Sequence, residues 1–240
     1  MKLFCIPHSG ASAQGYFQWK KRIDPGITLC PLELPGRGKR FKEPFFESVQ
    51  QAAVDLAGQI RELTAPGDTY ALFGHSMGAL LAFETYYHLE VDRRPAHIFF
   101  CGRKAPQDRE GPTAFYRLPD EAFLETVYRF GGNTRQLLEH DRMRCIFLPI
   151  LRADFRLVET YAWKPREEKL ACPFTVILGR RDESTAGADR NLWLEHGKGR
   201  VLTVEGDHFF LFEQPEELLN ILHTTLLGER EDEKSGGNRQ

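Results

Sequence analysis

The chain has 240 residues, enough for one large domain, and its formal net charge of −2 gives no basic surface of the kind that binds nucleic acid. No run of about 18 apolar residues is present, so we expect no membrane-spanning helix. The cysteines are odd in number, without a C-x-x-C motif or a metal-ligand cluster, which predicts reduced, buried thiols in a cytoplasmic protein without a metal: Cys5, Cys30, Cys101, Cys145 and Cys172.

Short apolar runs and helical patterns alternate along the chain. Polar residues end the first apolar run at once, so we interpret it as a strand rather than a signal peptide. The expected strands are Leu3–Ile6, Ile27–Leu32, Tyr70–Phe73, His97–Cys101, Phe174–Leu178 and Val201–Val204. The expected helices lie near Gln14–Arg22, Val49–Leu63, Met77–Leu89, Ala188–His196 and Pro215–Leu226. This alternation predicts an α/β fold, a mostly parallel sheet with helices on both faces.

The segment between Cys101 and Phe174 breaks the alternation, because it holds helical patterns and no convincing strand. These patterns lie around Asp120–Phe130, Thr134–Leu138 and Asp141–Tyr161, and Asp120 is the expected N-cap of the first. A helical insertion at about 112–169, beside the edge where the strands end, would cover an active site as a lid. We expect one domain over 1–228 and a disordered, charged tail at 229–240.

The stretch Gly74-His-Ser-Met-Gly78 matches the G-x-S-x-G pattern of a nucleophile elbow. Apolar Leu72-Phe73 precedes it and good helix formers follow it, as a strand-turn-helix requires. Such a turn lifts a serine hydroxyl above the sheet. The motif and its context predict Ser76 as a nucleophile.

A serine nucleophile needs a base, and the base needs a group that orients it. In folds with this elbow the order along the chain is Ser, then Asp or Glu, then His. His208 follows the last expected strand and is the expected base, whereas His196 and His223 are expected at the surface of helices. Asp182 lies just past the end of the fifth strand, where open parallel sheets place their sites, and is the expected acid, with Glu183 as the alternative.

An oxyanion hole needs two backbone donors. The N–H of Met77, directly after the nucleophile, is the first candidate. The second is the N–H of Ser9, in the small-residue loop after the first strand. His8, in the same loop, precedes the nucleophile and is expected to be a packing or loop residue.

These segments resemble the type II thioesterases, free-standing editing enzymes of nonribosomal peptide and polyketide assembly lines with an α/β-hydrolase fold. The segments that carry the resemblance are Pro7-His-Ser-Gly-Ala11, Glu33-Leu-Pro-Gly-Arg-Gly-Lys-Arg-Phe-Lys-Glu-Pro44, Gly74-His-Ser-Met-Gly78, Leu148-Pro-Ile-Leu-Arg-Ala-Asp-Phe155 and Gly206-Asp-His-Phe-Phe210. The resemblance covers essentially residues 1–228. Ser9 and Ala11 replace an alanine and a glycine of the family's first segment, and the backbone donors survive both changes.

The resemblance implies that a Ser76–His208–Asp182 triad removes acyl groups, including stalled or aberrant ones, from the phosphopantetheine thiol of acyl or peptidyl carrier proteins. It implies no cofactor, and we expect a monomer. Three basic residues are candidates for contact with the pantetheine phosphate or an acidic carrier surface: Arg37, Lys39 and Arg40. A solvated loop, or Arg37 as an internal tie, are the alternatives. Some of the lid's aromatic side chains are expected to line an acyl chamber and most to form its core: Phe115, Phe123, Phe130, Tyr161 and Trp163.

Three other functions share parts of this pattern. A carboxylesterase or lipase-like hydrolase of small esters would have the same triad, but the Leu34-Pro-Gly-Arg-Gly38 segment and the lid motif argue against it. A catalytically inactive carrier-binding protein would not need an intact triad. A soluble acyltransferase would pass the acyl group to an alcohol or amine instead of water.

Overall fold

The computed structural model of the chain describes residues 1–108, 114–131, 134–213 and 215–228. The tail expected to be disordered, 229–240, lies outside these ranges. The expected start of the lid, near residue 112, lies outside them as well.

Six strands form one sheet in the order β2-β1-β3-β4-β5-β6, and every neighbouring pair is parallel. The strands are β1 (Lys2–Ile6), β2 (Thr28–Pro31), β3 (Tyr70–His75), β4 (His97–Cys101), β5 (Leu170–Gly179) and β6 (Gly197–Val204). All six predicted strands are therefore confirmed. The central strands are buried on both faces, which is why their sequences are continuous apolar runs rather than alternating ones.

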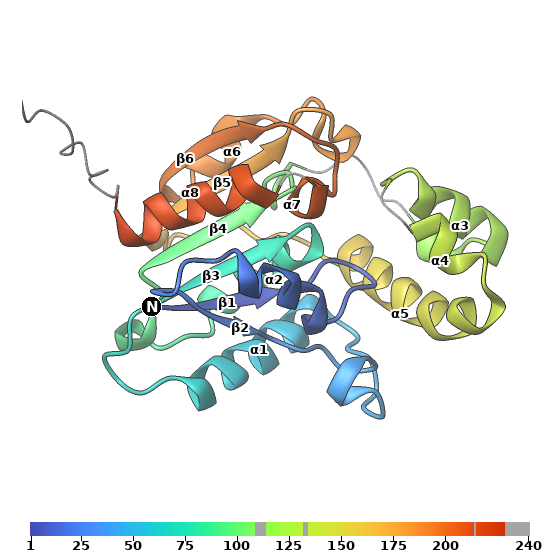
Figure 1. Cartoon of the computed structure of the whole chain (residues 1–240), viewed down its shortest axis with the longest axis horizontal. Coiled ribbons are helices and arrows are strands. Elements are labelled where there is room, and N and C mark those ends of the chain that lie inside the picture. The colour runs from blue at the N-terminus through green and yellow to red at the C-terminus, as the bar shows by residue number, and fades with distance from the viewer. Residues whose placement is uncertain (109–113, 132–133, 214, 229–240) are drawn as a thin grey trace, which may run out of the picture.

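Helices cover both faces of the sheet, as the alternation predicts (Figure 1). One face packs against α1 (Val49–Leu63), α2 (Met77–Tyr86) and α6 (Arg190–Leu194). The other packs against η1 (Ala13–Lys21), α7 (Phe210–Glu213) and α8 (Pro215–Leu227). The first predicted helix is a 3₁₀-helix, and α7 was not predicted because four residues show no helical period. Short 3₁₀ turns complete the connections: η2 (Gly38–Arg40), η3 (Val91–Arg93), η4 (Phe115–Arg117) and η5 (Glu183–Thr185).

The strand order positions the site. The chain runs from β1 to β2 on one side and then returns to place β3 on the other side of β1. Open parallel sheets bind their ligands outside the carboxyl ends of the strands at such a reversal. The loops that follow β1 and β3 therefore meet at the expected ligand crevice.

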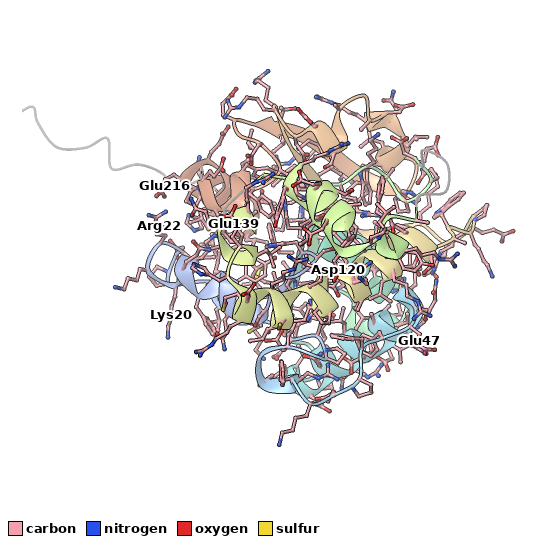
Figure 2. All side chains as sticks on the ribbon, turned by 90° about the vertical axis from the view of Figure 1, so that its right-hand side faces the viewer. Lys20, Arg22, Glu47, Asp120, Glu139 and Glu216 are labelled. Carbon is pink, nitrogen blue, oxygen red and sulfur yellow. The ribbon has the colours of Figure 1, made fainter. Side chains whose placement is uncertain are left out.

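The insertion between β4 and β5 contains α3 (Asp120–Tyr128), α4 (Thr134–Leu138) and α5 (Asp141–Thr160), and we call these three helices the lid. They lie together beside the sheet, at the right in Figure 1 and in front of the sheet in Figure 2, where Asp120 is labelled. The predicted N-cap role of Asp120 is wrong, since Pro119 caps α3 and the Asp120 carboxylate instead accepts from Arg152 at 2.6 Å. The lid has a small apolar core of its own: Phe123, Leu124, Val127, Leu138 and Leu151.

The two halves of α5 differ in how they are held. The first half is largely exposed, and Pro149, inside the helix, removes one backbone hydrogen bond. The second half contributes Leu157 to the main core, and the hydroxyl of Tyr161, next to its end, donates to the buried Glu84 of α2 at 2.7 Å. The lid is thus attached to the sheet through the second half of α5.

We expect amide hydrogen exchange to divide the lid near Pro149. Amides in α3, α4 and the first half of α5 should exchange faster than those of Asp154–Thr160, because they depend on the small lid core alone. Exchange measured by mass spectrometry checks this, with the fully buried β3 as the slow reference. Equal protection along all of α5 would contradict the division.

The cysteine and membrane expectations have mixed outcomes. All five cysteines are free thiols, and Cys5, Cys101 and Cys172 are buried. The expectation of burial is wrong for Cys145, which is exposed on α5, and Cys30 is only partly buried. None of the described helices combines the length and the apolar character that crossing a bilayer requires.

Candidate active site

Ser76 stands in the turn between β3 and α2, in a backbone conformation that side chains rarely adopt. Its φ is 55°, the only positive value at a non-glycine position among the described residues. The Ser76 N–H donates to the carbonyl of Cys101 at the end of β4, at 2.8 Å, and this bond secures the turn against the neighbouring strand. Strain of this kind, about 1–3 kcal/mol, persists at functional sites where the surrounding fold imposes it.

The two motif glycines are required by close packing. A Cβ at Gly74 would lie 2.1 Å from the carbonyl oxygen of Gly78, and a Cβ at Gly78 would lie 2.2 Å from that of Ile6. Both contacts are with backbone, which cannot move aside. The G-x-S-x-G spacing therefore lets α2 start directly against β1 and β3, with Ser76 at the carboxyl edge of the sheet.

His208 and Asp182 come together at the same edge. His208 follows β6 and Asp182 follows β5, and the Nδ1 atom of His208 lies 3.0 Å from Oδ2 of Asp182. Both side chains are almost fully buried, whereas the neighbouring Glu183 is exposed. Of the two acids considered, the structure pairs Asp182 with the histidine.

Ser184 completes this arrangement, and the sequence analysis missed it. Its hydroxyl donates to Oδ1 of Asp182 at 2.6 Å, and its backbone N–H donates to the same oxygen at 3.0 Å. The hydroxyl also lies 3.1 Å from Nδ1 of His208. An acceptor two residues before a serine is a local turn signal that could have revealed it.

The hydrogen bonds at Asp182 keep this carboxylate charged. Burial alone would raise its pKa, but the hydrogen bond and charge of His208, together with the two donors of Ser184, outweigh burial and hold the pKa below its ordinary value. A charged Asp182 can fix the Nδ1–H tautomer of His208 and leaves Nε2 to act as the base.

Two further histidines stand beside His208. The rings of His75 and His208 are 5.0 Å apart, and His8 contacts His75 at 5.8 Å. Burial, and then the charges of His208 and Arg37, lower the pKa of His8 to about 3. Burial first, and then His208, lowers the pKa of His75 well below its ordinary value. Both are too weakly basic for proton transfer near neutral pH, so the structure supports the packing role expected for His8.

His196 and His223 take no part in this cluster, although neither is a surface residue as expected. Nε2 of His196 lies 2.7 Å from the Oε1 atom of Gln107, and Nε2 of His223 accepts from the N–H of Asp24 at 3.0 Å. Both rings are partly buried. They tie neighbouring segments together and lie outside the candidate site.

The loop after β1, residues 7–12, lies next to the elbow, and we call it the β1 loop. Ser9 lines the same cavity as Ser76 and His208. Met77 is the first residue of α2, and the first N–H groups of a helix have no partner within it. The structure therefore brings both expected oxyanion donors to the edge that carries Ser76.

A cavity of about 650 Å³ lies between this edge and the lid. Ser76 and His208 stand in its wall, and the lid supplies an apolar side made of Val127, Phe130, Leu138, Phe147, Leu151 and Phe155. Of the aromatic residues expected in the lid, Phe130 and Tyr161 line the cavity and Phe123 is in the lid core. Phe115 is exposed and Trp163 packs against the main core, so neither has the expected place. The cavity has room for an acyl chain.

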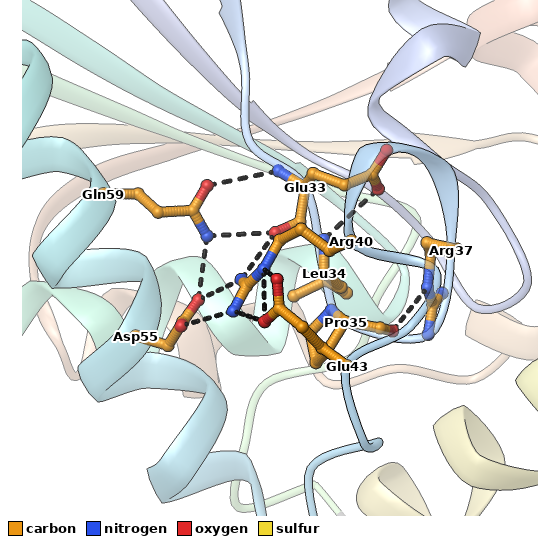
Figure 3. Close-up of polar contacts among 8 residues, drawn as sticks. All are labelled: Glu33, Leu34, Pro35, Arg37, Arg40, Glu43, Asp55 and Gln59. Carbon is orange, nitrogen blue, oxygen red and sulfur yellow. Dashed lines mark hydrogen bonds and ion pairs between the residues drawn. The ribbon is translucent and has the colours of Figure 1, made fainter.

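Of the three basic residues expected to contact the pantetheine phosphate or a carrier, Arg37 and Arg40 are held in internal ion pairs. Figure 3 shows Arg40 held between Glu43 and Asp55, with hydrogen bonds of 2.6–3.0 Å to their carboxylates. Arg37 is 4% exposed and pairs with Asp154 of α5, so contact with a partner protein is excluded by its burial and the internal tie is the correct alternative. Lys39 is exposed.

The site shows no metal-binding arrangement within the described residues, where no three His, Cys, Asp or Glu side chains converge. The groups present are a hydroxyl, a histidine paired with a charged carboxylate, and backbone donors beside an apolar cavity. This set fits acyl transfer through a serine.

Comparison with known proteins agrees with this chemistry. The thioesterase domain family matches residues 1–226. The linear gramicidin dehydrogenase LgrE of Brevibacillus parabrevis is 36% identical, with 93% of this chain and 87% of LgrE covered. The thioesterase PikA5 of Streptomyces venezuelae is 33% identical, with 95% and 81% covered. The structure of YbtT, a type II thioesterase from the yersiniabactin nonribosomal peptide/polyketide pathway, superposes with a TM-score of 0.82 at 26% identity, with 92% and 91% covered.

Proposed function

The chain belongs to the thioesterase domain family, and from this premise we propose that it hydrolyses acyl thioesters held on the phosphopantetheine arm of carrier proteins in nonribosomal peptide or polyketide biosynthesis. Its α/β-hydrolase fold and its thioester hydrolase activity are those of its relatives. The observation that carries the proposal is that His208, paired with the charged Asp182, stands in the wall of the cavity that Ser76 also lines.

In the proposed reaction, Ser76 Oγ attacks the thioester carbonyl carbon while Nε2 of His208 takes the hydroxyl proton. The N–H groups of Met77 and Ser9 stabilise the oxyanion. The carbon–sulfur bond then breaks, and the thiolate takes the proton from His208. Water then gives a proton to His208 and attacks the acyl-enzyme carbonyl carbon; the ester bond to Ser76 Oγ breaks, His208 returns the proton to this oxygen, and the acid is released. Because a thiol has a pKa of about 8.5, it leaves far more easily than an amine.

We further propose that residues 1–228 act as one domain and as a monomer, with the insertion at about 112–169 as the lid over the acyl chamber. The lid's apolar wall supports this role. A reducing, cytoplasmic location is supported by five free thiols, three of them buried.

One relative carries the name of a dehydrogenase, a class of enzyme that commonly uses a dinucleotide cofactor. A dinucleotide site in an α/β sheet uses a G-x-G-x-x-G run directly after the first strand. In this chain the β1 loop has a single glycine, Gly10. The residues of the β1 loop fit an oxyanion loop and do not match the G-x-G-x-x-G pattern. We therefore keep thioester hydrolysis as the proposed function.

The test is to compare one short acyl group on three carriers: a holo carrier protein, coenzyme A and a simple alcohol. We expect kcat/KM to be highest on the carrier protein, because docking raises the effective concentration of the thioester at Ser76. Modest dependence on chain length is also expected from an apolar chamber. Equal rates on carrier and coenzyme A would contradict carrier recognition, and a preference for the oxygen ester would favour a carboxylesterase.

A pair of charge-reversal variants tests the docking surface. Lys39→Glu should lower kcat/KM for the carrier-bound substrate more than for the coenzyme A thioester, because Lys39 is exposed and can meet an acidic carrier, whereas Arg37 and Arg40 are held in internal ion pairs. Lys20→Glu, an exposed position on η1 labelled in Figure 2, is the matched control and should affect both substrates equally.

A further inference from the structure

Arg37 and Asp154 form a buried ion pair next to the active site. Nη1 and Nη2 of Arg37 each lie 2.6 Å from one oxygen of Asp154, and the two side chains are 4% and 1% exposed. Arg37 lies just before η2, and Asp154 lies on the second half of α5. The pair therefore joins the body of the domain to the lid.

The pair also holds the β1 loop at two successive residues. Oδ2 of Asp154 accepts the N–H of Gly10 at 2.7 Å, and Nη1 of Arg37 donates to the carbonyl of Ala11 at 3.1 Å. The loop rests directly on α5, since a Cβ at Gly10 would lie 2.5 Å from the side chain of Leu151. The β1 loop and the lid helix are therefore closely packed at Gly10.

The geometry of the loop shows what these bonds hold. The N–H of Ala11 donates to the carbonyl of His8 at 3.1 Å, and Gly10 has a φ of 81°. A four-residue turn with a positive φ at its third residue is typical of type II, with Ser9 second. Asp154 accepts from the central peptide of this turn and so opposes the flip that would convert it to another type.

We propose that Arg37 and Asp154 are a positioning pair that fixes the Ser9 N–H as an oxyanion donor, a role that rests on the proposed function. Asp154 fixes the orientation of the Ser9–Gly10 peptide. Arg37 fixes the positions of the Asp154 carboxylate and of the Ala11 carbonyl. Since Asp154 belongs to α5, the donor is in place only when the second half of the lid helix is seated on the β1 loop. Neither residue touches the reacting atoms.

Two variants remove the tie in different ways. Asp154→Asn removes the charge that Arg37 requires and weakens the acceptor of Gly10. Because one buried unpaired charge can unfold a domain, the double variant Arg37→Met/Asp154→Leu replaces both partners with apolar side chains. A Tm within a few degrees of the wild type qualifies either variant for kinetics.

The measurements are kcat and KM for a small thioester, and the Kd of an aryl boronic acid, which bonds to the serine and places an oxygen in the oxyanion hole. We expect kcat to fall about 10- to 100-fold with little change in KM, because the Ser9 N–H stabilises only the transition state and a misplaced donor loses that stabilisation without weakening substrate binding. The boronate Kd should rise by the same factor. A role in stability alone would not change the two in parallel.

Two further variants serve as controls. Arg152→Met removes an ion pair of the same length on the same helix, which ties α5 to Asp120 and to the carbonyls of Tyr116 and Leu118 just before α3, and it should change the boronate Kd by less than twofold. Arg37→Lys keeps the Asp154 charge balanced and the Gly10 bond available, so its loss of kcat should be smaller than that of Asp154→Asn.

Three results would overturn the proposal: wild-type kcat and boronate Kd in a folded Arg37→Met/Asp154→Leu variant, a change confined to KM, or an equal loss in Arg152→Met. Failure of the proposed function itself is distinguishable, because it is read from the wild-type protein alone: without serine catalysis there would be no thioester turnover and no Ser76-dependent boronate binding, and a carboxylesterase would prefer the oxygen ester.

Discussion

Replacement of Ser76 by alanine is expected to reduce thioester turnover to the background rate, a loss of about 10⁶-fold by analogy with removal of the nucleophile from a serine protease. Alanine has the same Cβ as serine, so the strained backbone at φ 55° is no worse in the variant. The fold and Tm should therefore be retained. Initial rates with a carrier-bound or small thioester, together with circular dichroism, check both statements.

Ser184 provides the matched control, because its hydroxyl lies 3.1 Å from Nδ1 of His208. Ser184→Ala should lose far less activity than Ser76→Ala, since it removes one of the donors to Asp182 but leaves the His208 bond. A fluorophosphonate should label Ser76 alone, as read by peptide mass spectrometry. Substantial turnover in Ser76→Ala, or labelling at Ser184, would refute the nucleophile assignment.

The Asp182→Asn variant should fold and lose about 10⁴-fold in kcat, the cost of the equivalent change in a serine protease. The neutral amide cannot hold Nδ1 of His208 as the donor, nor stabilise the ring when it is charged. In the wild type the carboxylate is charged well into the acid range, because its hydrogen bonds lower its pKa. The pH profile of the residual kcat of Asp182→Asn distinguishes a changed tautomer of His208 from unfolding of the variant.

His208→Ala is expected to be as inactive as Asp182→Asn, because the two residues act as one unit. Glu183→Gln is the neighbouring control, and this exposed side chain should be insensitive. A strong effect at Glu183 with a mild one at Asp182 would move the acid by one residue. It would also leave the 3.0 Å contact between His208 and Asp182 without a catalytic role.

The fold was predictable because buried parallel strands are continuous apolar runs that local sequence reveals. The elbow was predictable from the spacing of its motif, although only one glycine is required by a contact within the turn: a Cβ at Gly74 would lie 2.1 Å from Gly78, whereas a Cβ at Gly78 would lie 2.2 Å from Ile6 of β1. The four-residue α7 was not predictable, because a single turn has no periodicity, and neither was the cap of α3, because its N-cap position is held by Pro119 without any side-chain hydrogen bond.

The role of Arg37 shows where local reasoning ends. An arginine among glycines and lysines has the composition of a solvated loop, and its partner Asp154 lies 117 positions away. Nothing within a window of sequence indicates that the two meet. Ser184 is the opposite case, because its bonds to Asp182 span only two residues. Once Asp182 is assigned as the acid, the Asp-x-Ser spacing predicts this turn and its hydrogen bonds.

The separate lid core has a consequence for how such an enzyme diversifies. The lid residues of the chamber wall pack mostly against one another, in a cluster that shares no member with the two cores of the sheet. Substitutions at Val127 or Leu138 can therefore reshape the acyl chamber while the elbow and the loop that carries His208 keep their geometry. Substrate range is then a trait that selection, or a mutant library confined to α3 and α4, can vary without rebuilding the catalytic apparatus.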